Sequence, residues 1–164
     1  MTQDIVRALG LLCLGTRMKR IGDRLQAETQ RIMQEFDVPV QAGQYPLMAA
    51  IDRLGPLSIG ELAEAVGITQ PGATRAASLL VKLGVFEMKT AKDDQRRRVL
   101  SLTKHGQALV AQGKREVWPQ IEGAVADLCN DLSGPLLGQL AAIEDGLDEA
   151  PLIKRRPVKR KPRR

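Results

Sequence analysis

The stretch Ser58-Ile-Gly-Glu-Leu-Ala-Glu-Ala-Val-Gly-Ile-Thr-Gln-Pro71 predicts two short helices joined by a tight turn. Ser58, followed three residues later by a glutamate, forms a capping box, in which each side chain satisfies a free N–H group of the first helical turn. Gly67 ends this helix, because glycine adopts the left-handed conformation at little cost. Thr69 caps the next helix, and its proline falls in the first turn, where a missing N–H matters least. Two helices so closely joined are typical of a helix-turn-helix.

The second helix has a small apolar side and a polar side. Spacings of three and four predict that one side is buried, and it comprises Ala73, Ala76, Ala77, Leu80 and Leu83. The opposite side carries Gln70, Gly72, Thr74, Arg75, Ser78 and Lys82. In helix-turn-helix proteins the first turns of this helix enter the major groove, where Gln and Arg pair with base edges. The alternative is a helix that is polar only because it is solvated.

A basic hairpin follows the two helices. Residues 85–90 and 99–102 are short, apolar or β-branched and roughly alternating, which predicts two strands. The loop between them, 91–98, holds four basic residues and two carboxylates, a composition that suits phosphates or a minor groove. Arginines on a loop are often only solvated charge, but their place directly after a capped helix pair favours a winged helix-turn-helix.

These motifs resemble the multiple-antibiotic-resistance regulator (MarR) family. The resemblance covers about residues 5–148 in architecture, and its specific motifs are Leu57–Ala63, Gly67–Arg75, Asp94–Arg96 and Leu100–Gly106. It implies that Asp94 braces the wing and that Arg96 enters the minor groove. Gly72 departs from the pattern, since many relatives carry a hydroxyl side chain there.

By the same resemblance Gln70, Ala73, Thr74 and Arg75 face the groove. The candidate DNA-binding residues are Ser58, Thr69, Gln70, Gly72, Ala73, Thr74, Arg75, Lys82, Lys92, Asp94, Arg96, Arg97 and Arg98.

The charge distribution supports a local rather than a global nucleic-acid surface. The formal net charge is +6, but eight of the 25 basic residues lie in the last fourteen positions, and the other 17 stand against 19 acidic residues. Between Gly67 and Lys104, eight basic residues face three acidic ones. A basic stripe on an acidic body is an electrostatic footprint for DNA.

The flanking segments predict further helices. A long helix from about Asp4 to Phe36 is weakened by three glycines, at 10, 15 and 22, so a bend is expected there. Pro46 opens a helix that runs through Leu47, Ile51 and Leu54 and ends at Gly55. Thr103 caps a helix to about Asn130, which Pro119 should kink near Trp118, and Ser133 caps a last helix to about Leu147.

The expected fold is mainly α with a small β-hairpin wing, as one domain over 1–150. The winged helix-turn-helix spans about 44–103, and the resemblance makes the helices at about 4–36 and 104–148 the dimerisation helices. The apolar stripe Leu136, Leu137, Leu140, Ile143 and Leu147 is wider than a lone surface helix needs. It packs either within its own chain or against a partner. A two-fold dimer would place two reading helices roughly 34 Å apart.

The segment Pro151–Arg164 has three prolines and eight cations and predicts a disordered basic tail. It either binds phosphates without reading sequence or is merely solvated. Deleting it and repeating a salt titration of DNA binding separates these interpretations, since only a phosphate-binding tail contributes to the salt slope.

No catalytic, cofactor or metal motif is recognised, so neither an enzyme nor a cofactor is expected. The only histidine, His105, fits an exposed position, and Cys13 and Cys129 fit small core residues of a cytoplasmic protein. No secretory leader or membrane span is evident, so a cytoplasmic location and no membrane contact are expected.

The sequence therefore predicts a homodimeric transcriptional regulator that binds double-stranded DNA, a repressor released by a small-molecule effector. Arg17, Arg20, Tyr45, Met48 and Trp118 are candidates to border the effector pocket, and each also has a core or surface explanation. Three alternatives remain. They are redox sensing through Cys13, unselective architectural DNA binding, and a regulatory module for a separate acetyltransferase.

Overall fold

The computed structural model describes residues 3–91 and 96–155. The chain forms two compact units, residues 1–124 and 125–164. The helices are α1 Ile5–Ala8, α2 Leu14–Gln34, α3 Tyr45–Leu54, α4 Ile59–Val66, α5 Gln70–Lys82, α6 Lys104–Gln112, α7 Trp118–Cys129 and α8 Leu136–Glu149. The two strands are β1 Phe86–Thr90 and β2 Arg98–Leu102. Shorter 3-10 segments occupy Gly10–Cys13, Ala42–Gln44 and Leu152–Arg155.

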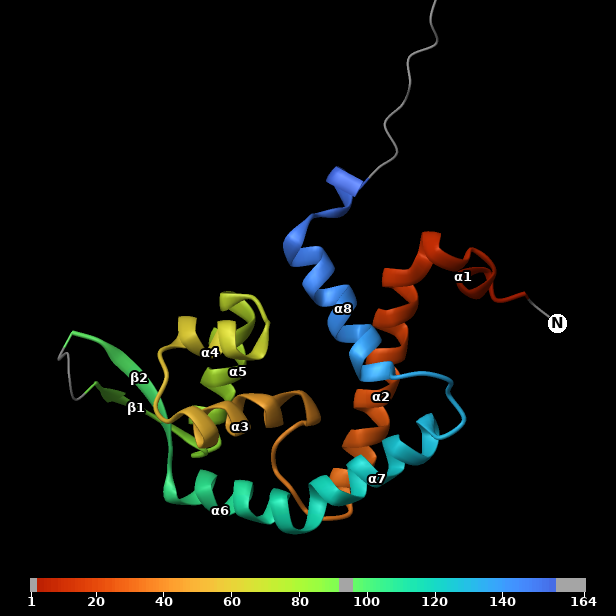
Figure 1. Cartoon of the computed structure of the whole chain (residues 1–164). Helices are drawn as coiled ribbons and strands as arrows, with labels where there is room; N and C mark the ends of the chain where they lie inside the picture. Colours follow the sequence, from red (N-terminus) through yellow and green to blue (C-terminus); the bar gives the residue numbers. More distant parts are fainter. Residues whose placement is uncertain (1–2, 92–95, 156–164) are drawn as a thin grey trace, which may run out of the picture. The chain divides into compact units, whose positions relative to one another are not determined.

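The centre of the first unit is a helix-turn-helix with a hairpin beside it. Figure 1 shows α4 and α5 lying together over α3, the hairpin extending beside them, and α6 running beneath. The strands are antiparallel, with Phe86 opposite Leu102 and Thr90 opposite Arg98. The mainly α fold with a two-stranded wing is thus confirmed.

One apolar core joins these elements. Its largest fully buried side chains come from every element around it and are Met33, Val40, Leu47, Met48, Leu62, Leu80, Val85, Phe86, Leu100, Val110 and Val117. Because α4, α5, the strands and α6 all contribute to this cluster, burial of apolar surface fixes their mutual positions.

The N-terminal helix is broken rather than continuous. Gly10 has φ +55°, a left-handed conformation that an α-helix cannot contain, and it separates α1 from the segment that leads into α2. The other two glycines named for a bend, Gly15 and Gly22, lie inside α2 without interrupting it.

The long helix after the wing contains a π-helical turn, Gly113–Val117, between α6 and α7. The N–H of Trp118 bonds to the carbonyl of Gly113, five residues back. The predicted irregularity near Pro119 therefore takes the form of a wide turn just before the proline. Such turns are rare and concentrate at functional sites.

Two predictions about helix ends and faces are wrong. Ser133 does not cap the last helix: α8 begins at Leu136 with Pro135 at its N-cap, because Gly134 turns the chain with φ +87° between Ser133 and the helix. Leu83 is 43% exposed, since it follows the last residue of α5 and leaves the buried side of that helix.

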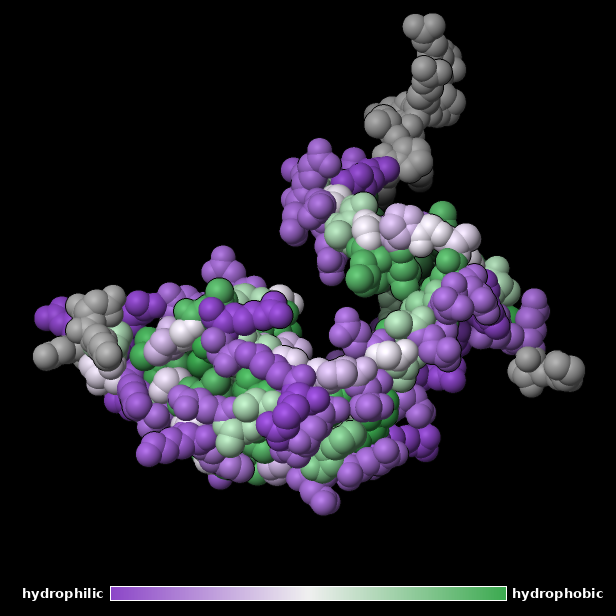
Figure 2. Space-filling view, turned by 60° about the horizontal axis from the view of Figure 1, so that its bottom comes forward, coloured by the Kyte–Doolittle hydropathy of each residue, from purple (hydrophilic) through white to green (hydrophobic). Residues whose placement is uncertain are grey.

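The second unit consists of the end of α7, then α8 and the segment Leu152–Arg155. None of the described side chains of α8 is buried, although Leu137 and Leu147 are apolar. Figure 2 shows hydrophobic surface exposed among hydrophilic side chains. Among the described residues, the helices lack an apolar stretch that could cross a bilayer.

Candidate nucleic-acid interface

The first helix of the pair, α4, starts at the predicted capping box. The hydroxyl of Ser58 accepts a hydrogen bond from the N–H of Glu61 (3.3 Å), and the Ser58 N–H donates to a carboxylate oxygen of Glu61 (2.8 Å). The helix ends at Gly67 with φ +69°, and the N–H of Ile68 returns to the carbonyl of Ala63 (3.0 Å). These local bonds leave a turn of three residues before α5, which fixes the angle between the helices.

The second helix, α5, presents its polar side to solvent. Thr69 caps it by accepting from the N–H of Gly72 (3.3 Å). The exposed side chains are Gln70, Thr74, Arg75, Ser78 and Lys82, while Gly72 is half-buried. Of these, the amide of Gln70 and the guanidinium of Arg75 have the donor geometry that base edges accept.

Two hydroxyls on this side bond to their own helix. Thr74 donates to the carbonyl of Gln70 (2.9 Å), and Ser78 donates to the carbonyl of Thr74 (2.8 Å). Each hydroxyl oxygen keeps acceptor capacity.

Ala73 does not belong to the exposed side. It is completely buried and packs toward the core with Ala77 and Leu80. The groove-facing position that the family resemblance implied for Ala73 is therefore corrected, because its methyl group has no access to a ligand outside the protein.

The hairpin is anchored to the body of the unit at its base. Leu57 and Leu100 exchange two backbone hydrogen bonds (3.1 and 2.7 Å), so the residue before the capping box pairs with β2. Nearer the tip, the N–H of Ala91 donates to the carbonyl of Arg97 (2.7 Å).

The wing arginines lie next to this closure. Arg96 and Arg98 are exposed, and Arg97 is half-buried. Two of the predicted wing residues, Lys92 and Asp94, lie outside the described residues.

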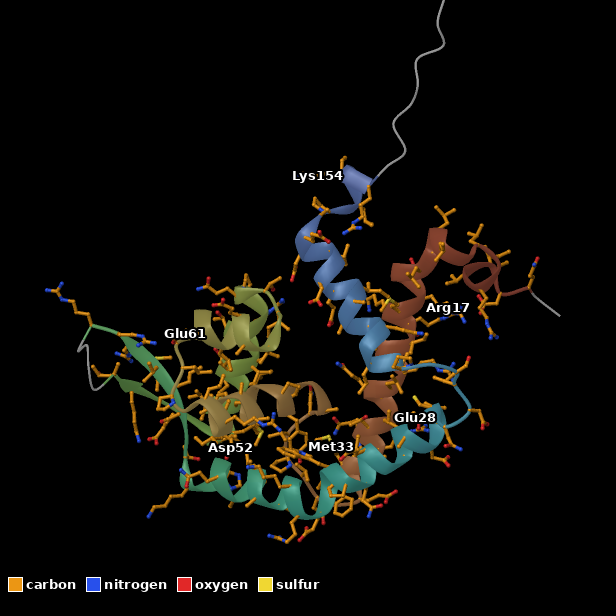
Figure 3. The ribbon with its side chains drawn as sticks, viewed as in Figure 1. Arg17, Glu28, Met33, Asp52, Glu61 and Lys154 are labelled. Atoms are coloured by element: carbon orange, nitrogen blue, oxygen red, sulfur yellow. The ribbon has the colours of Figure 1, made fainter. Side chains whose placement is uncertain are left out.

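An ion pair joins the wing to α4. The guanidinium of Arg97 donates to Glu61 Oε1, while Glu61 Oε2 accepts from both the N–H and the hydroxyl of Ser58. These hydrogen bonds lower the pKa of Glu61 to about 2. The Ser58 N–H has the largest effect, followed by the Ser58 hydroxyl and then by Arg97. Figure 3 shows Glu61 at the start of α4 beside the hairpin. Sequence reasoning missed this pair, because its partners are 36 residues apart and neither residue signals the other.

The residues proposed for an effector pocket are only partly brought together. Tyr45 and Trp118 pack edge to face with ring centroids 5.7 Å apart, and Met48 lies in the same core. The Tyr45 hydroxyl is buried without a hydrogen-bond partner among the described residues, and burial raises the pKa of Tyr45. Arg20 instead donates to both carboxylate oxygens of Asp4 (3.2 and 3.0 Å) at the other end of α2.

Arg17 also lies on α2, in its first turn, and is half-buried. The two arginines therefore belong to α2, whereas Tyr45, Met48 and Trp118 belong to the core beside the π-helical turn.

The two cysteines are free thiols. Cys13 ends the segment before α2 and Cys129 ends α7, and both are half-buried rather than core residues. The only histidine, His105, is exposed in the first turn of α6, as its position predicts.

Comparison with known proteins identifies the segment that carries the site. The family model described as MarR family matches residues 36–97. No curated protein sequence matches the chain.

Solved structures of regulators share the fold. The transcriptional repressor CouR, bound to a 23-mer DNA duplex, is 25% identical, with a TM-score of 0.68 over 80% of this chain and 92% of CouR. BpsR of Bordetella bronchiseptica, whose DNA binding is regulated by 6-hydroxynicotinic acid, is 20% identical, with a TM-score of 0.65 over 84% and 94%. The transcriptional regulator MosR of M. tuberculosis, in complex with DNA, is 18% identical, with a TM-score of 0.66 over 84% and 96%.

Residues 36–97 are therefore similar to the MarR family, and the chain shares its winged helix fold with these solved transcriptional regulators.

Proposed function

We propose that the protein binds DNA sequence-specifically as a homodimer and acts as a repressor that a small-molecule effector releases. The observation that carries this proposal is the joint exposure of the polar side of α5 and the wing arginines on one unit. Gln70 and Arg75 extend from the first turns of α5, where a major groove is read. Arg96 and Arg98 are exposed on the wing, where a minor groove attracts arginine.

Two of the similar structures support the DNA partner. CouR is bound to a DNA duplex and MosR is in complex with DNA, and both share the fold over most of their length. By analogy, we expect α5 of this chain in the major groove and its wing at the adjacent minor groove.

Exposed apolar side chains support the dimer. In the first unit Leu11 and Leu12 are 87% and 81% exposed, and in the second Leu128, Leu137 and Leu152 are 66%, 81% and 69% exposed. Large apolar side chains grouped on a surface mark a protein interface. A symmetric pair presents two reading helices to a near-palindromic operator.

The proposal of an effector is based on the similar protein BpsR, whose DNA binding is regulated by 6-hydroxynicotinic acid. An effector that prefers one spacing of the two reading helices shifts the population that binds DNA. The buried Tyr45 hydroxyl, which has no partner among the described residues, is the polar group best suited to meet a ligand at the core edge near Trp118.

The test is selection from a random duplex library with the purified full chain, followed by competition. A sequence-specific regulator enriches an inverted repeat and prefers it to random duplex by a factor on the order of a thousand or more. Enrichment without a repeat, or a preference of only a few-fold, contradicts the proposal and favours unselective architectural binding.

A further inference from the structure

We propose that the Glu61–Arg97 ion pair sets the position of the wing relative to the reading helix, so that Glu61 and Arg97 are positioning residues for DNA binding. The inference rests on the proposed function and assigns these two side chains a role within it. Arg97 then acts on DNA through the wing that it holds, and its neighbours Arg96 and Arg98 make the contacts.

The helix cap holds the Glu61 carboxylate in place independently of Arg97. Glu61 Oε2 accepts from the Ser58 N–H (2.8 Å) and the Ser58 hydroxyl (2.7 Å), which leaves Oε1 for the guanidinium. A side chain already ordered by its own helix cap loses little further freedom when it pairs, so the usual entropic cost of a surface ion pair is reduced.

Arg97 lies near the tip of the wing, away from the backbone hydrogen bonds at its base. Its carbonyl accepts from the N–H of Ala91 (2.7 Å), which closes the hairpin, and β2 begins at the next residue. The other anchor, between Leu57 and Leu100, lies further toward the base of the hairpin. The ion pair therefore restrains the tip side of the wing, which the backbone anchor at Leu100 does not reach.

The other end of the pair belongs to the reading head. α4 packs against α5, and Leu62 of α4 is buried in one core cluster with Ala77 and Leu80 of α5. A restraint from Arg97 to the first turn of α4 thus fixes the wing relative to α5. Pre-arranging two contact elements lowers the ordering cost of binding.

The sign of the electrostatic effect makes this role testable. A carboxylate beside a DNA-binding surface repels phosphates, so its removal by itself tightens binding or leaves it unchanged. If Glu61 positions the wing, its neutralisation weakens binding instead. Glutamine is the right replacement, because it preserves the capping box with Ser58 while it removes the charge.

The experiment measures the affinity of the full chain for its selected duplex in four variants, with thermal unfolding and stoichiometric titration to confirm a folded, fully active protein. Glu61→Gln and Arg97→Gln each weaken binding by roughly three- to tenfold, and the double variant is no weaker than the weaker single variant. Glu64→Gln, which removes a carboxylate one turn along the exposed side of α4, binds as tightly as the wild type or more tightly.

Salt dependence separates positioning from phosphate contact. Arg98→Gln lowers the salt slope by about one, because it removes a cation that neutralises DNA charge, whereas Glu61→Gln leaves the slope unchanged. The proposal is overturned if Glu61→Gln binds as tightly as Glu64→Gln, or if the losses of Glu61→Gln and Arg97→Gln add. A wild-type chain that selects no duplex overturns the proposed function instead.

Discussion

The lowered pKa of Glu61 makes the free energy of unfolding depend on pH between about 2 and 4.5. Its pKa falls from 4.5 to about 2 on folding, so its ionised form stabilises the folded state. This contribution is fully present above pH 4.5 and is lost as the pH falls through 2. We expect the difference in unfolding free energy between the wild type and Glu61→Gln, measured by denaturant titration, to shrink across that window. Equal differences at pH 7 and pH 2 would contradict the assignment.

Arg75 is the residue on which base reading is expected to depend most. It is exposed on the first half of α5, where a guanidinium can pair with a guanine edge. Arg75→Ala should cost roughly 1–3 kcal/mol of binding free energy and relax specificity at one base pair. Lys82→Ala, in the last turn of the same helix, is the matched control and should weaken all duplexes equally. Uniform losses for Arg75→Ala would reduce it to a phosphate contact.

Among the elements, the start of α6 depends on a glycine. A Cβ at Gly106 would overlap the carbonyl oxygen of Val85, which already accepts from the N–H of Thr103 (3.0 Å). Gly106→Ala should therefore destabilise the fold by about 1–3 kcal/mol, because the start of α6 must move away from the Val85 carbonyl, just before β1. Gly123→Ala, in α7, meets open space and should be neutral or stabilising by up to about 1 kcal/mol. Denaturant unfolding of both variants makes the comparison, and equal effects would refute the packing argument.

The elements that sequence reasoning predicted are those whose signals are local. Ser58, Thr69 and Thr103 each bond to a backbone N–H three residues on, so the sequence itself contains both partners. Ser133 fits the same rule and fails, because Gly134 turns the chain before a helix can start. Pro119 predicted an irregularity here, but its π-helical form had no recognised signal, and Gly113 lies so close to Trp118 and Tyr45 that a Cβ there would meet both side chains.

For the whole molecule, the main prediction is its oligomeric state. The native mass in solution should be about twice the chain mass of 17.9 kDa, because exposed leucines on both units need a partner surface. The double variant Leu11→Glu with Leu12→Glu, and separately Leu137→Glu, should shift the protein toward monomer in light scattering.

The matched control is Leu54→Glu, at the end of α3, where a leucine is 63% exposed without belonging to either predicted dimerisation segment. It should leave the dimer intact. Monomeric wild type would contradict the prediction, as would dissociation by all three changes alike.

The candidate site could be predicted from the sequence only in part. The polar side of α5 followed from periodicity, and its exposure agrees for Gln70, Thr74 and Arg75. Ala73 shows the limit of family resemblance, since it is fully buried here. The link between Arg97 and Glu61 depends on how the hairpin folds back on α4, which no local pattern encodes.

The π-helical turn at Gly113–Val117 determines how the helix formed by α6 and α7 tolerates the loss of a residue. A bond that reaches five residues back lets the turn absorb one residue more than a regular helix holds. If the π-helical turn became regular α-helix without losing a residue, the part of the helix after it would be rotated about the helix axis by about 100°. Trp118 and Ile121, which pack on the core, would then be carried out of phase with Leu109. Deleting one residue within the turn would convert it to regular α-helix and leave the side chains after it facing the core as before. The same deletion in a regular α-helix would rotate those side chains away from the core.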